Sequence, residues 1–269
     1  MSRIVQSLIL IAVTVLTLGL SPAGNAGETL QRVIDFKTLK VGMTGEQPPM
    51  NMVNREKSLM GFDVDLAKAL ANAMRVKLEI KVLPFAELMP ALDDDRIDMV
   101  ISGMAITPER SEQASFVGPY MMSGKSMLTR NSVLAKVSDS AEFNRGDLKL
   151  AALKNSTSAS FVREGAPDAQ LIEVPNYDEA VQMVIDGEAD GLVADMPVCQ
   201  LAVLRFPNAG LVTLEKPLTV EPIGIAVNKD DAQFHNLVDN YLEAYTKIGV
   251  LAQLRKKWLE ENQWLAALP

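Results

Sequence analysis

The stretch Ser102-Gly103-Met104-Ala105-Ile106-Thr107-Pro108-Glu109-Arg110 joins a run with strand character to the start of a helix. Thr107 is placed to cap that helix. Pro108 suits the first helical position, because its missing N–H would have no partner there. Arg110 follows beside exposed backbone N–H groups, where a guanidinium can bind a carboxylate through two parallel hydrogen bonds. The stretch therefore predicts an anion-binding junction; an ordinary strand–turn–helix junction with a solvated arginine is the alternative.

Strand and helix patterns alternate on both sides of this stretch. Before it and within it we expect strands at 39–43, 77–83 and 97–102, and helices at 61–74 and 85–92. After it the pattern repeats, with strands at 148–153, 171–174 and 191–194 and helices at 157–164 and 177–185. Units of this size favour α/β architecture with mostly parallel sheets flanked by helices.

Two junctions in these units are closely similar, at 92–98 and at 184–190. In each, a helix ends in a tight turn where Asp95 or Gly187 can take a positive φ. The strands that follow end at Ser102 and at Asp195. Ligands of open α/β sheets bind outside the carboxyl ends of the strands, so the sequence predicts two half-sites, one from each unit.

The chain returns to a strand at 223–227, followed by helices at 233–247 and 251–259. This order is explained if the first lobe is interrupted in the sequence by the whole of the second lobe. We expect a first lobe at 27–124, a second lobe at 125–222 and a return segment of the first lobe at 223–269. The chain then crosses between the lobes twice, and two extended crossings make a hinge.

Residues 1–26 have the features of a secretory signal peptide rather than of a folded element. Arg3 supplies a short positive region, and the apolar run 8–20 is short for a bilayer span. Small residues follow, and cleavage is predicted after Ala26, or alternatively after Ala23. An uncleaved membrane anchor is the competing interpretation. The mature chain is predicted to be soluble and periplasmic.

Composition excludes several classes of function. The chain has 269 residues, and its 34 acidic residues exceed its 26 lysines and arginines, with no basic block, so nucleic acid is not an expected partner. Cys199 is the only cysteine and His235 the only histidine. An intrachain disulfide is therefore impossible, and the inventory gives poor support to a catalytic triad or a histidine-based metal site. No cofactor is predicted.

Several segments together resemble a known family. They are 61–66, 84–85, the opening stretch 102–110, and 224–227. The pattern is similar to that of the bacterial extracellular solute-binding proteins of family 3, over essentially the whole mature chain. The resemblance implies a two-lobed type II periplasmic-binding-protein fold that closes on an amino acid or similar small carboxylate. It also implies a monomer without catalysis, which delivers its ligand to the permease of an ABC-type uptake transporter.

Carried over to this sequence, the resemblance assigns the ligand's α-carboxylate to Arg110, with backbone groups of Gly103 and Ala105 on either side of Met104. Ser102 would approach the ligand's amino group. The first lobe thus supplies the anion-binding half of the site.

In the second lobe, the resemblance places Ser156 and Thr157 at the start of a helix. The positive end of that helix would complete the anion site. It pairs Asp195 with the α-ammonium and makes Phe85 an aromatic wall around the ligand's side chain. Each residue also has a plainer interpretation: Asp195 as a turn or cap residue, the hydroxyls as helix caps, and Phe85 as core packing.

The chain departs from the family pattern at four positions. Gln47 stands where a second aromatic wall is expected, and Thr44 where an acid is often found, although Glu46 lies close by. Ala105 lacks a hydroxyl. Asn155 replaces a glycine, which is tolerable if that position is left-handed. We therefore expect a zwitterion clamp with an altered side-chain pocket that includes Glu46 and Gln47.

Two other functions stay open at this point. Some proteins of this architecture are cyclohexadienyl dehydratases, which act on prephenate or arogenate and need a general acid in the cleft. Glu46, Glu221 or Asp195 would be the candidate acid. A ligand sensor that docks on a membrane receptor is the other alternative.

Overall fold

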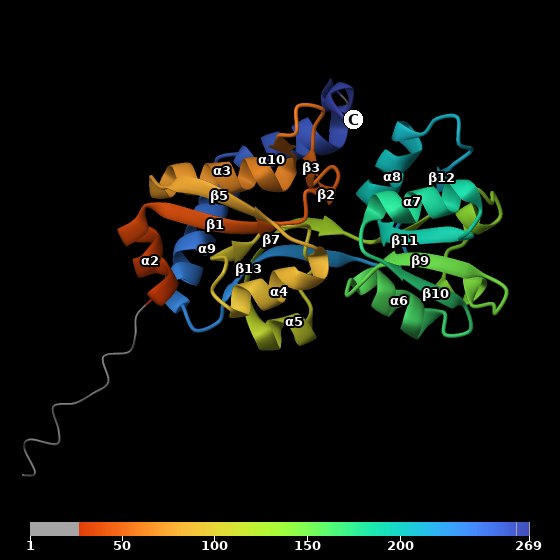
Figure 1. The fold of residues 1–269 in the computed structure, drawn as a ribbon, viewed down its shortest axis with the longest axis horizontal. Helices are drawn as coiled ribbons and strands as arrows, with labels where there is room; N and C mark the ends of the chain where they lie inside the picture. The colour runs from red at the N-terminus through yellow and green to blue at the C-terminus, as the bar shows by residue number, and fades with distance from the viewer. Residues whose placement is uncertain (1–26, 262, 269) are drawn as a thin grey trace, which may run out of the picture.

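The computed structural model describes residues 27–261 and 263–268. The predicted signal peptide lies outside these residues. Within them, no helix combines the length and the apolar character needed to cross a membrane. The described chain forms two lobes that lie side by side and are joined by extended segments (Figure 1).

The first lobe is built on a five-stranded sheet in the order β5–β1–β6–β13–β7. The bounds of its strands are β1 Thr38–Met43, β5 Lys77–Val82, β6 Met99–Val100, β7 Ala114–Ser123 and β13 Glu221–Asn228. A small three-stranded sheet lies beside it and is formed by β2 Glu46–Gln47, β3 Asn51–Val53 and β4 Leu59–Met60.

The second lobe has its own five-stranded sheet, in the order β10–β9–β11–β8–β12. The bounds of its strands are β8 Lys125–Thr129, β9 Lys149–Leu153, β10 Gln170–Val174, β11 Gly191–Asp195 and β12 Val212–Thr213. The two main sheets therefore have equal strand numbers.

The prediction of mostly parallel sheets holds for three strands in each lobe. β1 pairs in parallel with β5 and β6, and β9 with β10 and β11. The other pairings are antiparallel: β13 with β6 and β7, and β8 with β11 and β12. The sheets are mixed because β8 and β13 each follow a strand of the other lobe, so they enter their sheet from the crossing rather than from a strand–helix–strand unit.

Helices cover the sheets of both lobes (Figure 1). Those of the first lobe are α2 Glu28–Phe36, α3 Phe62–Met74, α4 Phe85–Asp93, α5 Pro108–Gln113, α9 Ala232–Lys247 and α10 Val250–Arg255, followed by the short turns Lys256–Glu260 and Gln263–Ala267. Those of the second lobe are α6 Thr157–Gly165, α7 Tyr177–Asp186 and α8 Met196–Arg205, with short 3₁₀ turns at Leu134–Lys136 and Ser140–Phe143. The predicted helices are confirmed to within a few residues.

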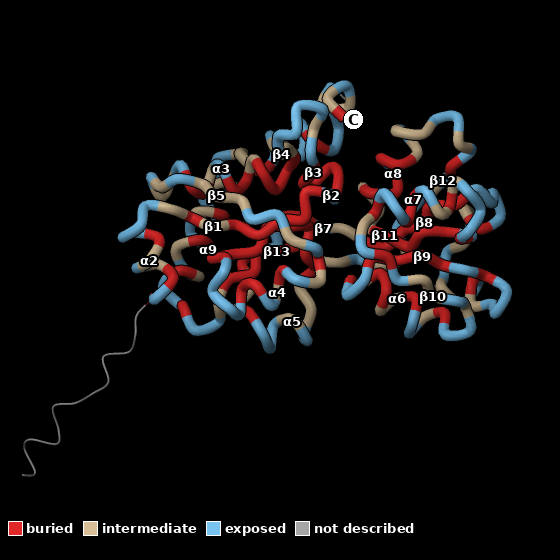
Figure 2. The backbone as a smooth tube through the Cα atoms, in the orientation of Figure 1, coloured by how far each residue is buried: buried red, intermediate tan, exposed pale blue. Residues whose placement is uncertain are grey.

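Buried side chains follow the two sheets (Figure 2). In the first lobe they come from β1, the inner face of α3 and the face of α9 that carries Phe234 and Val238. A further apolar cluster includes Phe85 of the first lobe and Leu153 and Tyr177 of the second, so apolar contacts continue across the junction. Cys199 is buried and free, as predicted for a structural thiol.

A buried polar network lies next to the carboxyl ends of β1 and β6. Asp63 is fully buried and accepts hydrogen bonds from the Tyr120 hydroxyl (2.8 Å) and the Asn51 amide (2.9 Å). The Asn51 side chain also accepts from Thr44 and donates to Ser102. The network therefore ties the loop after β1 to the end of β6. Burial raises the pKa of Asp63 from 3.8 to about 6, although its hydrogen-bond donors act in the opposite direction.

This raised pKa predicts a pH-dependent stability. Between about pH 4 and pH 6 the folded state holds more protons than the unfolded state, so this carboxyl makes the free energy of unfolding fall as the pH rises. Asp63→Asn removes the titration. From pH 4 to pH 7, we expect the stability of the variant relative to wild type to increase by a few kcal/mol. Denaturant melts across this range measure it.

The exposed Asp239→Asn serves as the control, for which we expect a flat difference in unfolding free energy. A flat difference for Asp63→Asn as well would show that Asp63 does not titrate in this window.

Candidate ligand-binding site between the lobes

The opening stretch of the sequence lies at the edge of the first lobe that faces the second. The Thr107 hydroxyl accepts a hydrogen bond from the backbone N–H of Arg110 at 3.2 Å, and Pro108 occupies the first turn of α5. The predicted helix start is therefore confirmed. It brings the Arg110 side chain to the boundary between the lobes.

Arg110 contacts both lobes. Its Nη1 donates to the Ala105 carbonyl at 2.9 Å and its Nη2 to the Asn155 carbonyl of the second lobe at 3.2 Å. The guanidinium carbon lies 5.5 Å from the centre of the Phe85 ring, within cation–π range. Burial lowers the pKa of Arg110, while the charges of Glu221 and Asp195 act to raise it. A guanidinium in a protein keeps its charge, so the cleft holds a fixed cation.

A second buried cation, Lys125, lies where the chain crosses between the lobes. Its side chain is almost fully buried, and its Nζ contacts Asp195 at 2.7 Å and Glu221 at 2.9 Å. Burial alone would lower the pKa of Lys125, but these two carboxylates raise it. One positive and two negative charges leave this cluster with a net charge of −1. It can therefore attract a cationic group, as Arg110 attracts an anionic one.

Lys125 was not predicted as a site residue from the sequence, and Glu221 was predicted only as a candidate acid. Lys125 opens β8, a fully buried strand whose other residues are uncharged, and a charged residue at the start of an uncharged strand is the signal that was available. The register of the sheet places Lys125 directly opposite Asp195. That pairing joins residues 70 positions apart, and no local pattern reveals it.

Asp195 lies at the end of β11 and at the first position before α8, but its side chain forms no helix-cap hydrogen bond. The alternative of a simple cap is therefore wrong. One carboxylate oxygen accepts from Lys125, and the carboxylate lines a cavity in the cleft. The role of Asp195 as partner of a ligand ammonium stays a prediction.

The Thr157 hydroxyl has a different partner from the ligand anion that the resemblance implied. It donates to Glu221 at 2.9 Å and so ties the start of α6 to β13. Ser156 caps α6 by accepting from the Ala159 N–H, and its hydroxyl donates to the Leu153 carbonyl. Asn155 has φ +59°, so the condition under which asparagine is tolerated in place of glycine, a left-handed backbone, is met.

Two predicted site residues have side chains that are almost completely buried. Ser102 is fully buried and accepts from the Thr44 N–H and the Asn51 amide. The Met104 side chain is buried in an apolar cluster. Ala105 contributes through its backbone, because its carbonyl accepts from Arg110.

The remaining predicted residues line two small cavities between the lobes, each of about 10 Å³. Glu46 and Phe85 face Tyr177 and Leu153 of the second lobe in one cavity. Partial burial and then the charge of Asp178 raise the pKa of Glu46. Gln47 and Gly103 line the other cavity together with Asp195. The cleft thus brings together Glu46, Gln47, Phe85, Gly103, Arg110 and Asp195, whereas the Ser102 and Ser156 hydroxyls bond within their own lobes.

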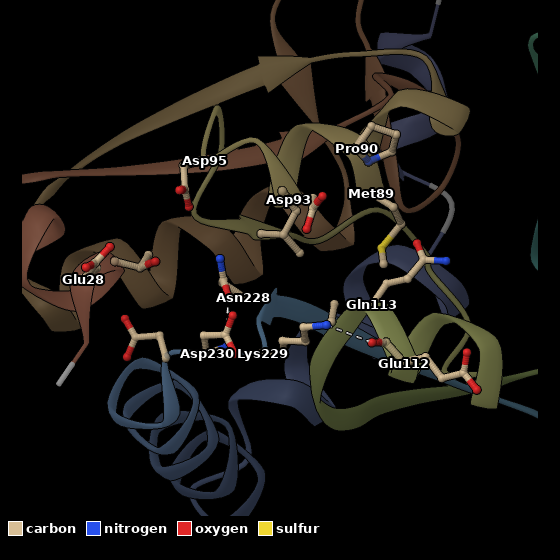
Figure 3. Close-up of a pocket in the computed structure, with 14 residues that line it drawn as sticks. Glu28, Met89, Pro90, Asp93, Asp95, Glu112, Gln113, Asn228, Lys229 and Asp230 are labelled. Atoms are coloured by element: carbon tan, nitrogen blue, oxygen red, sulfur yellow. Dashed lines mark hydrogen bonds between the residues drawn. The ribbon is translucent and has the colours of Figure 1, made fainter. Parts of the chain in front are cut away.

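A larger cavity, of about 700 Å³, lies within the first lobe and away from the cleft. Acidic side chains dominate its lining, and the Lys229 ammonium donates to the Glu112 carbonyl at 3.3 Å (Figure 3). Among the described residues, no cluster of His, Cys, Asp or Glu is arranged to hold a metal ion. This cavity contains no residue of the second lobe, so it cannot be the place where a ligand bridges the lobes.

Two crossings join the two α/β lobes, and a buried cation and an acidic cluster face each other between them. This arrangement defines a protein whose lobes close on a ligand. Residues 39–261 match the bacterial extracellular solute-binding proteins of family 3. The chain belongs to this family.

Its relatives include both binding proteins and an enzyme. The chain is 29% identical over 231 residues to a cyclohexadienyl dehydratase of Pseudomonas aeruginosa, covering 86% of each chain. It is 28% identical to an ABC transporter glutamine-binding protein of Bacillus subtilis, covering 87% of this chain and 86% of that protein.

Among solved structures, the binding component of an ABC transporter from Wolinella succinogenes, complexed with lysine, is 31% identical, with a TM-score of 0.80. The match covers 86% of this chain and 99% of that one. The type II periplasmic-binding-protein fold is therefore confirmed.

The buried cluster predicts a large stability loss when its cation is removed. In Lys125→Met, Asp195 and Glu221 stay in the cleft without their shared partner. Removing one member of a buried ion pair costs about 3 kcal/mol or more. We expect the melting temperature to fall by roughly 5–10 °C. Calorimetry measures it.

The exposed Lys136→Met makes the same chemical change on the surface and should leave the melting temperature within a degree or two. Equal melting temperatures for the two variants would contradict the structural role of Lys125.

Proposed function

We propose that this protein binds an amino acid between its two lobes and delivers it to the membrane permease of an ABC-type uptake transporter. The observation that carries the proposal is the opposition of charges in the cleft: Arg110 on one side and the Lys125–Asp195–Glu221 cluster, with its net charge of −1, on the other. The carboxylate of a zwitterionic amino acid matches the positive Arg110, and its ammonium matches the negative cluster. The family and its amino-acid-binding relatives support the same conclusion.

A ligand would close the hinge because it binds the closed form more tightly than the open form. Arg110 already reaches the backbone of the second lobe, so a carboxylate held at Arg110 contacts both lobes only when they approach each other. A ligand shifts a conformational equilibrium only as far as it prefers one state. The closed form is then the form that a permease recognises. The family's extracellular members support a periplasmic location for this protein.

Arg110→Ala tests the site. The substitution leaves the ligand carboxylate without its main charged partner, which costs about 3 kcal/mol or more. We expect the dissociation constant to rise by at least a hundredfold, measured by calorimetry with the amino acid that most stabilises the wild type in a thermal-shift screen.

Arg163→Ala is the matched control, because Arg163 is an exposed arginine of the second lobe that pairs with Glu173. Its affinity should stay within twofold of wild type. Retention of wild-type affinity by Arg110→Ala, with the melting temperature unchanged, would remove Arg110 from the site.

Catalysis is the second candidate, and the dehydratase relative is the specific observation in its favour. A general acid must hold a proton before it can donate one. The Lys125 ammonium hydrogen-bonds both Asp195 and Glu221, so neither is well placed for that role. Glu46, whose pKa is raised by burial and by Asp178, is the carboxyl best suited to it.

We expect no conversion when purified protein is incubated with prephenate or arogenate and the products are followed by chromatography. Formation of phenylpyruvate or phenylalanine that disappears in Glu46→Gln would instead establish the enzyme.

A further inference from the structure

A mostly apolar cavity of about 440 Å³ lies beside the two crossings between the lobes. The first lobe contributes the end of the chain, with Trp258 and Trp264, and the second lobe contributes residues of α8. Segment 122–124 of the first crossing and Val220 of the second complete the wall. Figure 1 shows α8 and the end of the chain on the upper side of the junction between the lobes. We call this space the crossing cavity.

Two buried polar atoms without a partner belong to the crossing cavity. Among the described residues, four buried side-chain polar atoms have no hydrogen-bond partner, and Ser123 Oγ and Trp264 Nε1 are two of them. Ser123 ends β7 and Trp264 lies near the end of the chain, yet both residues line this cavity. An unpaired buried polar group destabilises a folded protein, so two of them at one apolar cavity indicate a ligand that supplies the missing partner.

The two atoms and the rest of the wall define the chemistry of that ligand. An indole N–H can only donate and a hydroxyl can donate or accept, so one oxygen acceptor satisfies both atoms. The acceptor must be neutral, because none of the described residues that line the cavity is charged and a carboxylate would leave water without a cation to meet it. The volume falls in the range of roughly 300–1,000 Å³ that is usual for small-molecule pockets.

The position of the cavity couples it to the hinge. Leu201 of α8 belongs to the same buried cluster as Trp258 of the first lobe, so the wall joins both lobes. Ser123 also lines a cavity of the cleft. In this arrangement the lobes are close enough for Arg110 to donate to the Asn155 carbonyl. A molecule that contacts both walls favours the arrangement in which it fits, and such coupling between two sites is reciprocal.

We propose that the crossing cavity binds a small neutral molecule that is apolar apart from one carbonyl oxygen, which accepts from Trp264 Nε1 and Ser123 Oγ, and that its occupancy strengthens ligand binding in the cleft. The binding site stands on the cavity alone, whereas its effect on the cleft rests on the proposed function. The protein then responds to two molecules of different chemistry, a charged one in the cleft and a neutral one beside the crossings.

Three probes of similar size test the site without any cleft ligand. Acetophenone carries a neutral carbonyl on an apolar ring, ethylbenzene lacks the acceptor, and benzoate is charged. Their dissociation constants are measured by calorimetry with the wild type, Trp264→Phe and Ser123→Ala. Tyr241→Phe is the control, because it also removes a donor from an aromatic side chain, but one that bonds to the Ala73 carbonyl away from both sites.

We expect the wild type to bind acetophenone at least tenfold more tightly than benzoate. Trp264→Phe should weaken acetophenone binding about tenfold and change ethylbenzene binding by no more than about threefold, because only the ketone loses a hydrogen bond. Ser123→Ala should act in the same selective way, and Tyr241→Phe should match the wild type. Absence of acetophenone binding to the wild type, or equal weakening of both neutral probes by Trp264→Phe, would overturn the site.

The effect on the cleft is measured with the amino acid that most stabilises the wild type in a thermal-shift screen. We expect saturating acetophenone to tighten its binding at least threefold in the wild type. An unchanged affinity would overturn the coupling and leave the proposed function standing. If no amino acid stabilises the protein, the proposed function fails and the coupling with it, while the titrations with the three probes still decide the site.

A second copy of the chain is the competing occupant, because Leu204 and Val220 expose apolar surface at this cavity. We expect a monomer in analytical ultracentrifugation over a hundredfold range of concentration. A dimer that Leu204→Ser dissociates would assign this surface to self-association and overturn the small-molecule site.

Discussion

The rest of this structure depends on the need to pair a buried lysine. The Lys125 ammonium can be withdrawn from water only with compensating charge, and it receives two carboxylates, Asp195 and Glu221. These three residues come from β8, β11 and β13. The pairing of one buried charge therefore holds together both crossings and the strand ends that meet at the cleft. The hydrogen bonds of Thr157 and Thr219 to Glu221 extend the same cluster to α6 and to the second crossing.

The site is an arrangement of charges rather than a large cavity. Arg110 is fixed by a helix cap and an aromatic ring, and the acidic cluster opposite it is fixed by the pairing of β8 with β11. The same scaffold serves binding proteins and a dehydratase among the relatives. Acid catalysis in such a cleft would need a carboxyl that holds a proton. Here the two carboxylates nearest the hinge both accept from an ammonium.

Local features of the fold and site were predictable from the sequence because their causes are local. The cap at Thr107, and the positive φ angles at Asp95, Asn155 and Gly187, follow from the residue types and their immediate neighbours. The partners of Lys125 and Thr157 were not predictable, since they depend on which strands meet after the chain has crossed twice. The mixed sheets escaped prediction for the same reason. Strand direction in a crossing segment is a property of the whole topology.

The central position of β13 has a consequence for how the molecule assembles. This strand lies between β6 and β7, yet it enters the chain only after the whole second lobe. Its register pairs Val100 with Ala226, and such a long loop is slow to close, whereas every strand of the other sheet lies between residues 125 and 213. The second lobe can therefore complete its sheet on its own. The sheet of the first lobe stays incomplete until β13 pairs between β6 and β7. This topology favours a folding order in which the second lobe completes its sheet before the first.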